Sequence, residues 1–538
     1  MLILQDITYL HPNQDVLFSN ISLKLNTHDK AALTGNNGTG KSTLLQIAAG
    51  RLKPAAGTLT VPETPWYIPQ LTDQYNHLSI AEVLGVDRKL KAFREIIDGH
   101  MNEDNLALLN EDWTIEERSQ EALARWGLDG ISPDRKLGSL SGGQKTKVFL
   151  AGIQIHQPQL VLMDEPSNHL DGKARAQLYE YLTTCRETLL VVSHDRSLLN
   201  LLDKTYELSN KGITCFGGNY EFYASQKAIA REALDHDLKE QEKELRKAGA
   251  AERETLDRKQ KLDARGKKKQ EKAGLPTISM NTLRNNAEKS AARLKNTHGE
   301  KKEQLLSGLR QLRAGLPPEE HIRLDLEDPA LHSGKVRFSA ENINYDYGLG
   351  QLWSRDLSFD IRSGDRILLS GENGSGKTTL IRIILGELEP GAGRIFRTDA
   401  STLYIDQDYS LIDSRYTVYE QAQHFNTGKL QEHEIRTRLN RFLFGREDLD
   451  KPCNALSGGE RMRLTLCALS IRDQAPDMIV LDEPTNNLDI GNIEVLTGAI
   501  SSYRGTLLVV SHDAYFIRAL NLAFRLSTTS GDKTSLSW

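Results

Sequence analysis

The sequence contains few cysteines and no long apolar run, and each shortage excludes a class of protein. Its four cysteines, Cys185, Cys215, Cys453 and Cys467, lack the paired spacing of a zinc site, an iron–sulfur centre or a disulfide framework. No segment approaches the ~18 consecutive apolar residues of a membrane span. The N-terminus reads Met-Leu-Ile-Leu-Gln-Asp, without the basic and apolar regions of a secretion signal. We therefore predict a cytoplasmic protein.

The net charge is small, but the charges are unevenly distributed. The chain carries −5 overall, yet residues 231–313 contain 22 Lys and Arg against 14 Asp and Glu, a local charge of 22 − 14 = +8. A basic middle segment between acidic flanks indicates a binding function for that segment. With 538 residues the chain also exceeds what one hydrophobic core supports, so we expect at least two domains.

Two glycine-rich loops follow one template: Gly, four residues, Gly, Lys, then Ser or Thr. The glycines let successive backbone N–H groups surround a phosphate, and the following helix adds the positive end of its dipole. The lysine would reach the terminal phosphates, and the Ser or Thr hydroxyl would contact Mg²⁺. One copy could be an ordinary turn before a helix, but two copies predict two phosphate sites. The first loop comprises Gly35, Asn36, Asn37, Gly38, Thr39, Gly40, Lys41, Ser42 and Thr43, and the second comprises Gly371, Glu372, Asn373, Gly374, Ser375, Gly376, Lys377, Thr378 and Thr379.

The two halves of the chain align with a nearly steady offset. The loops lie 336 residues apart (371 − 35), whereas a later Asp-Glu pair lies 318 apart (482 − 164), so the first half holds a short insertion at about 81–128. Each half alternates strands and helices, which is typical of a largely parallel α/β sheet. The apolar residues 479–481 are followed by Asp482 and Glu483, so both carboxylates are expected at the edge where such sheets bind ligands.

Further repeated motifs carry a family resemblance. LSGGQ at 140–144 and LSGGE at 456–460, a strand running into Asp-Glu-Pro, and VVSHD at the end of each half occur twice in the same order. Over nearly all of residues 1–225 and 335–526 the chain resembles ATP-binding cassettes. The resemblance implies an ATPase that uses ATP and Mg²⁺, with the two cassettes pairing head to tail inside one chain that is monomeric away from its partner.

The resemblance also implies two composite sites, each built from both cassettes. The first would set its phosphate loop with Gln70, Asp164, Glu165 and His194 against the signature residues Ser457, Gly458 and Gly459. The second would set its phosphate loop with Gln407, Asp482, Glu483 and His512 against Ser141, Gly142 and Gly143. Asp171 and Asp489, in the two D-loops, are expected at these sites and could also act as helix N-caps.

The residue types suit phosphoryl transfer, which needs charge neutralisation and an oriented water more than a covalent intermediate. Asp164 and Asp482 are expected around Mg²⁺ together with Ser42, Thr378, Gln70 and Gln407. Glu165 and Glu483 would polarise the attacking water, with His194 and His512 as switch histidines. Tyr9 and Tyr345 are candidates for stacking on adenine, although a half-buried strand tyrosine is the simpler reading and Tyr347 competes with Tyr345.

The segment between the cassettes, residues 226–334, has the composition of long exposed helices. Two segments, 220–272 and 285–316, each carry one narrow and mostly apolar seam at a spacing of four and three residues, which predicts an antiparallel helical hairpin. The seams are Leu234, Leu238, Gln241 and Leu245 in the first segment and Leu305, Leu309, Leu312 and Leu316 in the second. Gly249 and Gly266 argue against one unbroken rod. The breaker at 273–277 places the tip nearby. We call the following residues the basic tip and predict that they bind RNA, although a solvated hairpin explains them too: Arg265, Lys267, Lys268, Lys269, Lys272, Arg284 and Lys289.

Two cassettes joined by a charged helical linker, with the D-loop strings SNHLD and TNNLD, resemble the ABC-F proteins over the whole chain. This predicts an α/β protein with two P-loop cassette domains, 1–225 and 335–538, joined by a long antiparallel α-helical linker hairpin. The resemblance implies a ribosome partner, with the linker reaching peptidyl-tRNA near the tRNA exit site, in translation regulation or antibiotic resistance. The alternative is the ATPase subunit of a membrane importer. Residues 527–538 are expected to form a short tail.

Overall fold

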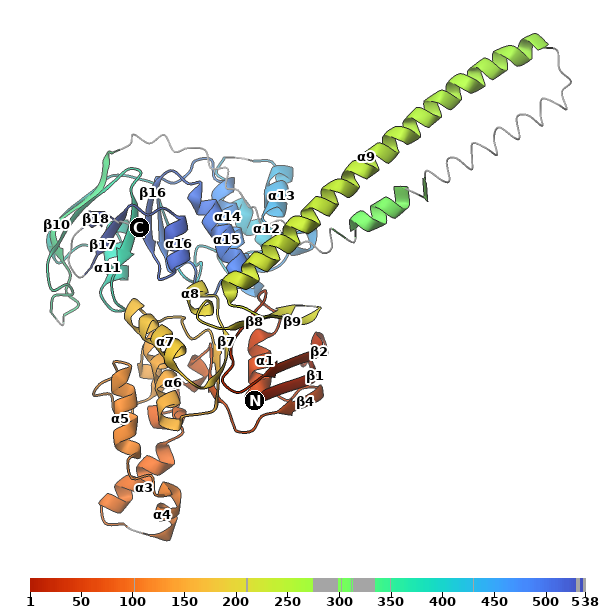
Figure 1. The fold of residues 1–538 in the computed structure, drawn as a ribbon. Helices are drawn as coiled ribbons and strands as arrows, with labels where there is room; N and C mark the ends of the chain where they lie inside the picture. The colour runs from red at the N-terminus through yellow and green to blue at the C-terminus, as the bar shows by residue number, and fades with distance from the viewer. Residues whose placement is uncertain are drawn as a thin grey trace. The chain divides into compact units, whose positions relative to one another are not determined.

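We describe the protein from a computed structural model that covers residues 1–100, 102–209, 211–273, 299–300, 302–310, 312, 334–348, 350–428, 430–528 and 533–535 (Figure 1). Contacts divide the chain into one unit made of Met1–Phe222 and His321–Trp538, and a second unit, Tyr223–Glu320. The first unit contains both cassettes. Among the described residues, no helix is both long enough and apolar enough to cross a membrane.

A six-stranded sheet forms the centre of each cassette, and the two sheets share one topology. In both, five strands run parallel and the last strand pairs antiparallel with its neighbour. The first sheet has the order β5 (Trp66–Ile68), β6 (Leu160–Asp164), β7 (Thr188–Val192), β3 (Lys30–Thr34), β8 (Lys204–Ser209) and β9 (Gly212–Phe216). The second has the order β14 (Thr402–Ile405), β15 (Met478–Asp482), β16 (Thr506–Val510), β12 (Arg366–Ser370), β17 (Phe524–Ser527) and β18 (Lys533–Ser535).

The inner strands of these sheets are apolar throughout because both faces are covered. All five residues of β6 and of β7 are buried, as parallel sheets require. A smaller antiparallel sheet completes each cassette. It has the order β2 (Val16–Leu25), β1 (Leu2–Leu10) and β4 (Ala56–Thr60) in the first, and β11 (Leu357–Arg362), β10 (Val336–Asn344) and β13 (Ala392–Arg397) in the second.

The helices that cover the central sheets follow the same order in both cassettes. In the first cassette these are α1 (Lys41–Ala48), α6 (Gly142–His156), α7 (Gly172–Thr184) and α8 (Arg196–Leu199). Their counterparts are α11 (Lys377–Leu385), α14 (Gly458–Ile471), α15 (Ile490–Ser501) and α16 (Ala514–Ala519). Single 3-10 turns lie at Asp73–Tyr75, Leu137–Ser139, Arg446–Asp448 and Cys453–Ala455.

The halves differ where the sequence offset changes. The first cassette carries α2 (Ile80–Val83), α3 (Asp87–Ile97), α4 (Glu103–Leu109) and α5 (Ile115–Arg125), whereas the second has α12 (Val418–His424) and α13 (Glu432–Arg441). The inserted helices are tied together by ion pairs. Asp112 accepts from Lys89 at 2.9 Å and from Arg118 at 3.0 Å.

The second unit is dominated by α9, which runs from Tyr220 to Ala273 without a break. Its 54 residues correspond to a rod of about 80 Å. Residues 302–310 form a second helix, and a Cβ atom at Gly308 would lie only 2.9 Å from the Gln241 side chain of α9. Leu309 on the same helix is 5% exposed. The predicted helical hairpin and the two-cassette α/β fold are therefore confirmed.

Two smaller expectations were wrong. α9 passes through Gly249 and Gly266, because the roughly 1 kcal/mol that each glycine costs is small against the many good helix formers around it. The tail expected at 527–538 includes β18, which pairs antiparallel with β17 in the register Phe524 with Ser535. All three residues of β18 are polar, so no apolar pattern in the sequence marked this edge strand, which pairs with β17 through its backbone.

Candidate functional site

Each phosphate loop joins a buried strand to the N-terminus of a helix, as the motif requires. β3 leads to α1 and β12 leads to α11. The backbone turns sharply at Gly40 and Gly376, whose φ angles of 94° and 85° favour glycine. Neither residue can cap its helix with a side chain, so the first N–H groups of both helices remain available to an anion.

The loop lysines fold back over their own loops in the same way. Lys41 Nζ donates to Gly35 O at 2.7 Å and to Asn36 O at 3.0 Å, and Lys377 Nζ donates to Gly371 O and Glu372 O at the same two distances. Burial lowers the pKa of both lysines, although nearby carboxylates oppose this effect. Each ammonium group is thus held above a loop of backbone N–H groups, ready to exchange carbonyl partners for phosphate oxygens.

The acidic pair of each cassette lies at the end of its strand, next to the loop. Asp164 ends β6 and is 1% exposed, and Asp482 ends β15. Glu165 and Glu483 follow in left-handed backbone, with φ angles of 51° and 49°. Side chains other than glycine rarely adopt this conformation, which costs of order 1–3 kcal/mol and persists where the surroundings hold it in place. The same strain in both copies turns the glutamate away from the direction of its strand.

Each glutamate lies against the switch histidine of its own cassette. Nε2 of His194 is 3.3 Å from Oε1 of Glu165, and Nε2 of His512 is 3.3 Å from Oε1 of Glu483. Burial, reinforced by the neighbouring aspartate, raises the pKa of both glutamates, that of Glu483 to about 7. Burial likewise lowers the pKa of both histidines, that of His512 to about 4. In both pairs, burial therefore favours the uncharged carboxyl and the uncharged imidazole.

The residues around Asp164 fit a hard divalent cation such as Mg²⁺. Oδ1 of Asp164 is buried and accepts no hydrogen bond from any described residue. Ser42 lies close enough to this carboxylate to lower its pKa, and Thr378 does the same to Asp482. Carboxylate and hydroxyl oxygens are the ligands that Mg²⁺ prefers, and a bound cation would offset the burial that raises the pKa of both aspartates.

The second predicted site is assembled from both cassettes. A cavity of about 270 Å³ brings the first signature together with the second phosphate loop, Glu483 and the second switch histidine. Its lining includes Ser141, Gly142, Gly143, Asn373, Gly374, Gln407, Glu483 and His512. Nδ2 of Asn373 donates across the interface to the backbone O of His169, in the first D-loop, at 3.0 Å. The head-to-tail arrangement is thus present at this site.

At the first site, a hydrogen bond joins the first phosphate loop to the D-loop of the second cassette. The backbone N of Asn37, in the first phosphate loop, donates to Oδ2 of Asp489 at 3.1 Å. Asp489 also caps α15 by accepting from Asn492 N, as Asp171 caps α7 by accepting from Ala174 N. The D-loop aspartates are therefore helix caps, and that of the second cassette contacts the opposite phosphate loop as well. Ser141 and Ser457 cap the signature helices α6 and α14.

The tyrosines proposed for adenine lie close to the phosphate loops. Tyr9 packs beside Phe18 in the core of the first cassette, with ring centroids 6.2 Å apart. Tyr345 packs against Tyr347 at 4.8 Å, and the Tyr347 hydroxyl lies 3.0 Å from that of Thr379. The Tyr347 ring is 60% exposed, so both tyrosines of the second cassette stay candidates.

A second pair of tyrosines escaped the sequence reasoning. Tyr67 donates to Oδ2 of Asp164 at 3.4 Å, and Tyr404 donates to Oδ2 of Asp482 at 3.2 Å. Both lie three residues before the glutamines (70 − 67 and 407 − 404), so the repeat itself carried the signal. These hydroxyls orient the carboxylates that are expected to hold the cation.

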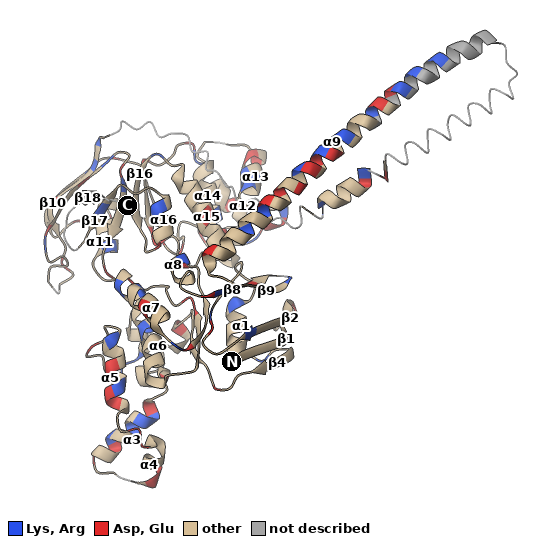
Figure 2. Ribbon diagram, viewed as in Figure 1, with Lys and Arg blue, Asp and Glu red and all other residues tan. Residues whose placement is uncertain are grey.

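Along α9, basic and acidic side chains alternate over much of the described length (Figure 2). Arg265 of the basic tip is exposed on this helix. Lys267, Lys268, Lys269 and Lys272 belong to the same helix, but their side chains lie outside the described residues, as do Arg284 and Lys289 altogether. The RNA-binding role of the basic tip stays a prediction.

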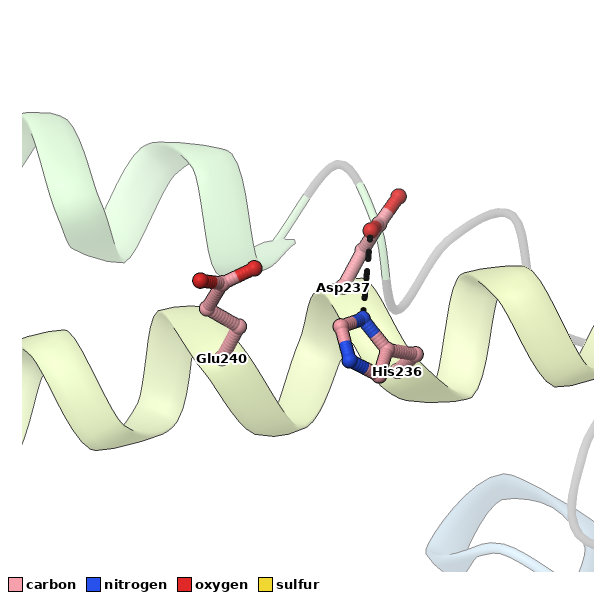
Figure 3. Close-up of side chains that lie close together, drawn as sticks. All are labelled: His236, Asp237 and Glu240. Atoms are coloured by element: carbon pink, nitrogen blue, oxygen red, sulfur yellow. Dashed lines mark ion pairs between the residues drawn. The ribbon is translucent and has the colours of Figure 1, made fainter.

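One other group of potential metal ligands lies on α9, away from the tip. His236, Asp237 and Glu240 offer atoms within 4.8 Å of one another, and Nδ1 of His236 is 3.9 Å from Oδ1 of Asp237 (Figure 3). All three side chains are exposed. Exposed polar groups on consecutive helical turns commonly face water, so we assign no ion to them.

Comparison with known proteins agrees with this geometry. The ABC transporter family matches residues 18–168 and 354–486. The putative ATP-binding protein YdiF of Bacillus subtilis is 32% identical over 94% of this chain and 77% of its own length. The tylosin resistance ATP-binding protein TlrC of Streptomyces fradiae is 30% identical over 93% of this chain and 92% of its own. The structure of an archaeal ribosome recycling factor, aABCE1, in complex with the stalk protein aP1 shares the fold, with a TM-score of 0.57, 21% identity, and coverage of 97% of this chain and 87% of that one.

Proposed function

Because this chain belongs to the ABC transporter family and, within it, to the ABC-F ATPases, we propose that it couples ATP hydrolysis to an action on the ribosome. Its two cassettes bind and hydrolyse ATP. The observation that carries the proposal is one chain with two intact cassettes and a long charged helix, α9, between them. The name of the relative TlrC, a tylosin resistance ATP-binding protein, supports a role in antibiotic resistance.

In the proposed mechanism, ATP closes the interface between the cassettes. Each phosphate loop holds the triphosphate of its own cassette, and the signature serine and backbone N–H groups of the other cassette complete the cage around the γ-phosphate. Both composite sites therefore reach full electrostatic stabilisation only in the closed state. This requirement links hydrolysis to the motion of the cassettes.

The buried side chains at the strand ends then act on the attacking water. Asp164 and Asp482 would hold Mg²⁺, which neutralises phosphate charge when bound. Glu165 and Glu483 would orient the water and accept its proton, and Nε2 of His194 and of His512 lies 3.3 Å from the respective glutamate. A protein with Glu165→Gln and Glu483→Gln should bind ATP and fail to turn it over. Wild-type turnover in that protein would remove both glutamates from the mechanism.

The linker is the part that we propose to act on RNA. Lysine and arginine recognise the phosphate backbone of folded RNA without reading base sequence, which suits the basic tip. A narrow helical hairpin can enter a space that a globular domain cannot. We propose that it reaches the peptidyl-tRNA near the tRNA exit site, in the cytoplasm, either to regulate translation or to protect the ribosome from an antibiotic.

The proposal is tested by sedimentation of the Glu165→Gln, Glu483→Gln protein with ribosomes, in ATP and in ADP. ATP should trap the closed state and bring the protein down with ribosomes, whereas ADP should leave most of it free. The ADP sample and a protein that also carries Lys41→Ala and Lys377→Ala, which should not bind ATP, are the controls. Sedimentation with membranes instead of ribosomes would favour an importer subunit. Absence from ribosomes in ATP as well as in ADP would refute the proposal.

A further inference from the structure

One arginine makes the two ATP sites unequal. Arg175, in the first turn of α7, lines the cavity of the second site together with Glu483 and His512. Its NH1 atom donates to the backbone O of His512, in the opposite cassette, at 2.9 Å. Its NH2 atom donates to Ser167 O, in its own cassette, at 3.2 Å. The guanidinium group therefore joins the first D-loop region to the switch loop of the second cassette.

The position of this side chain is fixed by further contacts. Its NH1 atom lies 3.6 Å from Oδ2 of Asp195, and the side chain is only 14% exposed. Nε is buried and has no hydrogen-bond partner within the part of the chain that the structure describes. A planar guanidinium with several fixed donors is well suited to hold two carbonyl groups from different domains at once.

At the first ATP site, an isoleucine takes the place of this arginine. The offset of 318 residues that aligns the D-loops pairs Arg175 with Ile493 (175 + 318). Ile493 is 6% exposed and belongs to the hydrophobic core of the second cassette. An isoleucine at this place cannot donate a hydrogen bond to the switch loop beside His194. Within the described part of the chain, the second site thus receives a cation from the opposite cassette at its switch histidine and the first does not.

We propose that Arg175 is a positioning residue for ATP hydrolysis at the second site alone. When the cassettes close, it holds the backbone at His512 and so fixes the switch histidine against Glu483. When they open, the contact at 2.9 Å is lost and the switch loop is released. Hydrolysis at the second site then depends on closure through a link that the first site lacks. This inference rests on the proposed assignment of two composite sites.

The test measures ATP turnover in two backgrounds that each keep one glutamate. With Glu165→Gln only the second site is intact, and with Glu483→Gln only the first. Adding Arg175→Ile, which copies the residue of the other cassette, should lower kcat about tenfold in the Glu165→Gln background, as expected for one lost hydrogen bond from a charged donor. KM for ATP should change little, because Arg175 contacts the switch loop. Turnover in the Glu483→Gln background should stay the same.

Two further variants separate positioning from folding. Arg175→Lys retains a hydrogen-bond donor and should recover part of the lost kcat. If the Arg175→Ile protein is unstable, the Lys variant can be tested in its place. Lys173→Ala removes an exposed charge from the same helix and should alter neither background. Equal losses in both backgrounds would mean that Arg175 supports the first cassette through Ser167 and Asp195, and would overturn the inference. Full activity of the Arg175→Ile protein in both backgrounds would also overturn the inference. Turnover by the Glu165→Gln, Glu483→Gln protein would instead refute the site assignment itself.

Discussion

The signature glycine Gly143 offers a sharp test of how the second site is built. A Cβ atom added there would lie 2.5 Å from the backbone O of His169, whereas real Cβ contacts essentially never fall under 3.0 Å. The D-loop would therefore have to move by at least 0.5 Å (3.0 − 2.5). The same oxygen accepts the hydrogen bond from Asn373 across the interface, so the displacement would disrupt this hydrogen bond between the cassettes.

The size of the effect follows from two terms. The lost hydrogen bond is worth about 1 kcal/mol, and the overpacking adds about 1 kcal/mol or more. Together they weaken closure at the second site by about 2 kcal/mol, which corresponds to about a 30-fold change in equilibrium. Gly143→Ala should thus release ATP from the second site while the first site still retains it.

The loss of ATP from the second site can be measured in the Glu165→Gln, Glu483→Gln protein as the labelled ATP retained after rapid gel filtration. The parent should keep nucleotide at both sites, and Gly143→Ala should keep about half as much. Gly459→Ala is the matched comparison, because its Cβ atom would meet the Asn492 side chain, which can rotate. Its effect should be smaller and confined to the first site. Thermal unfolding without nucleotide checks the fold. Full retention by Gly143→Ala would refute the closed geometry described here.

Two other predictions concern the linker and the cation site. Replacing the lysines at 267–269 with glutamine should weaken ribosome binding and lower the slope of log Kd against log salt by about 1 for each lysine that contacts a phosphate. The same change at the exposed lysines 239, 243 and 247 of α9 is the control, and equal slopes for the two triple variants would contradict an RNA-binding tip. Tyr404→Phe removes the 3.2 Å hydrogen bond to Asp482 and should raise the Mg²⁺ concentration needed for half-maximal turnover about tenfold in the Glu165→Gln background. An unchanged Mg²⁺ requirement would exclude a role for this hydroxyl in the cation site.

The sequence alone was sufficient to predict the parts of the protein that depend on local spacing. A phosphate loop lies between a strand and the N-terminus of a helix. The loops that begin at Gly35 and Gly371 therefore predicted a strand before and a helix after each of them. The apolar run before Asp482 predicted β15, because a strand buried on both faces has no polar alternation. The seam through Leu234 and Leu245 predicted a helix, since apolar residues recur at its period.

What the sequence did not predict depends on partners far away in the chain. Arg175 occurs in one cassette only, so no repeat marks it, and its partner His512 lies 337 residues away. The backbone of Glu165 and Glu483 is left-handed because the surrounding loops hold it there, and glutamate has no intrinsic preference for that conformation. Tyr67 and Tyr404 were marked by the repeat, but only the structure shows their hydroxyls at the aspartates.

We propose that ATP brings the linker of this protein against ribosomal RNA or tRNA. Arg265 is exposed on α9 at the start of the basic tip, so a photo-crosslinking residue placed there reports what the tip touches. In the Glu165→Gln, Glu483→Gln protein, irradiation with ribosomes and ATP should attach this position to ribosomal RNA or to tRNA, and ADP should abolish the product. A crosslink of equal yield in ADP, or the absence of any RNA product in ATP, would contradict the account.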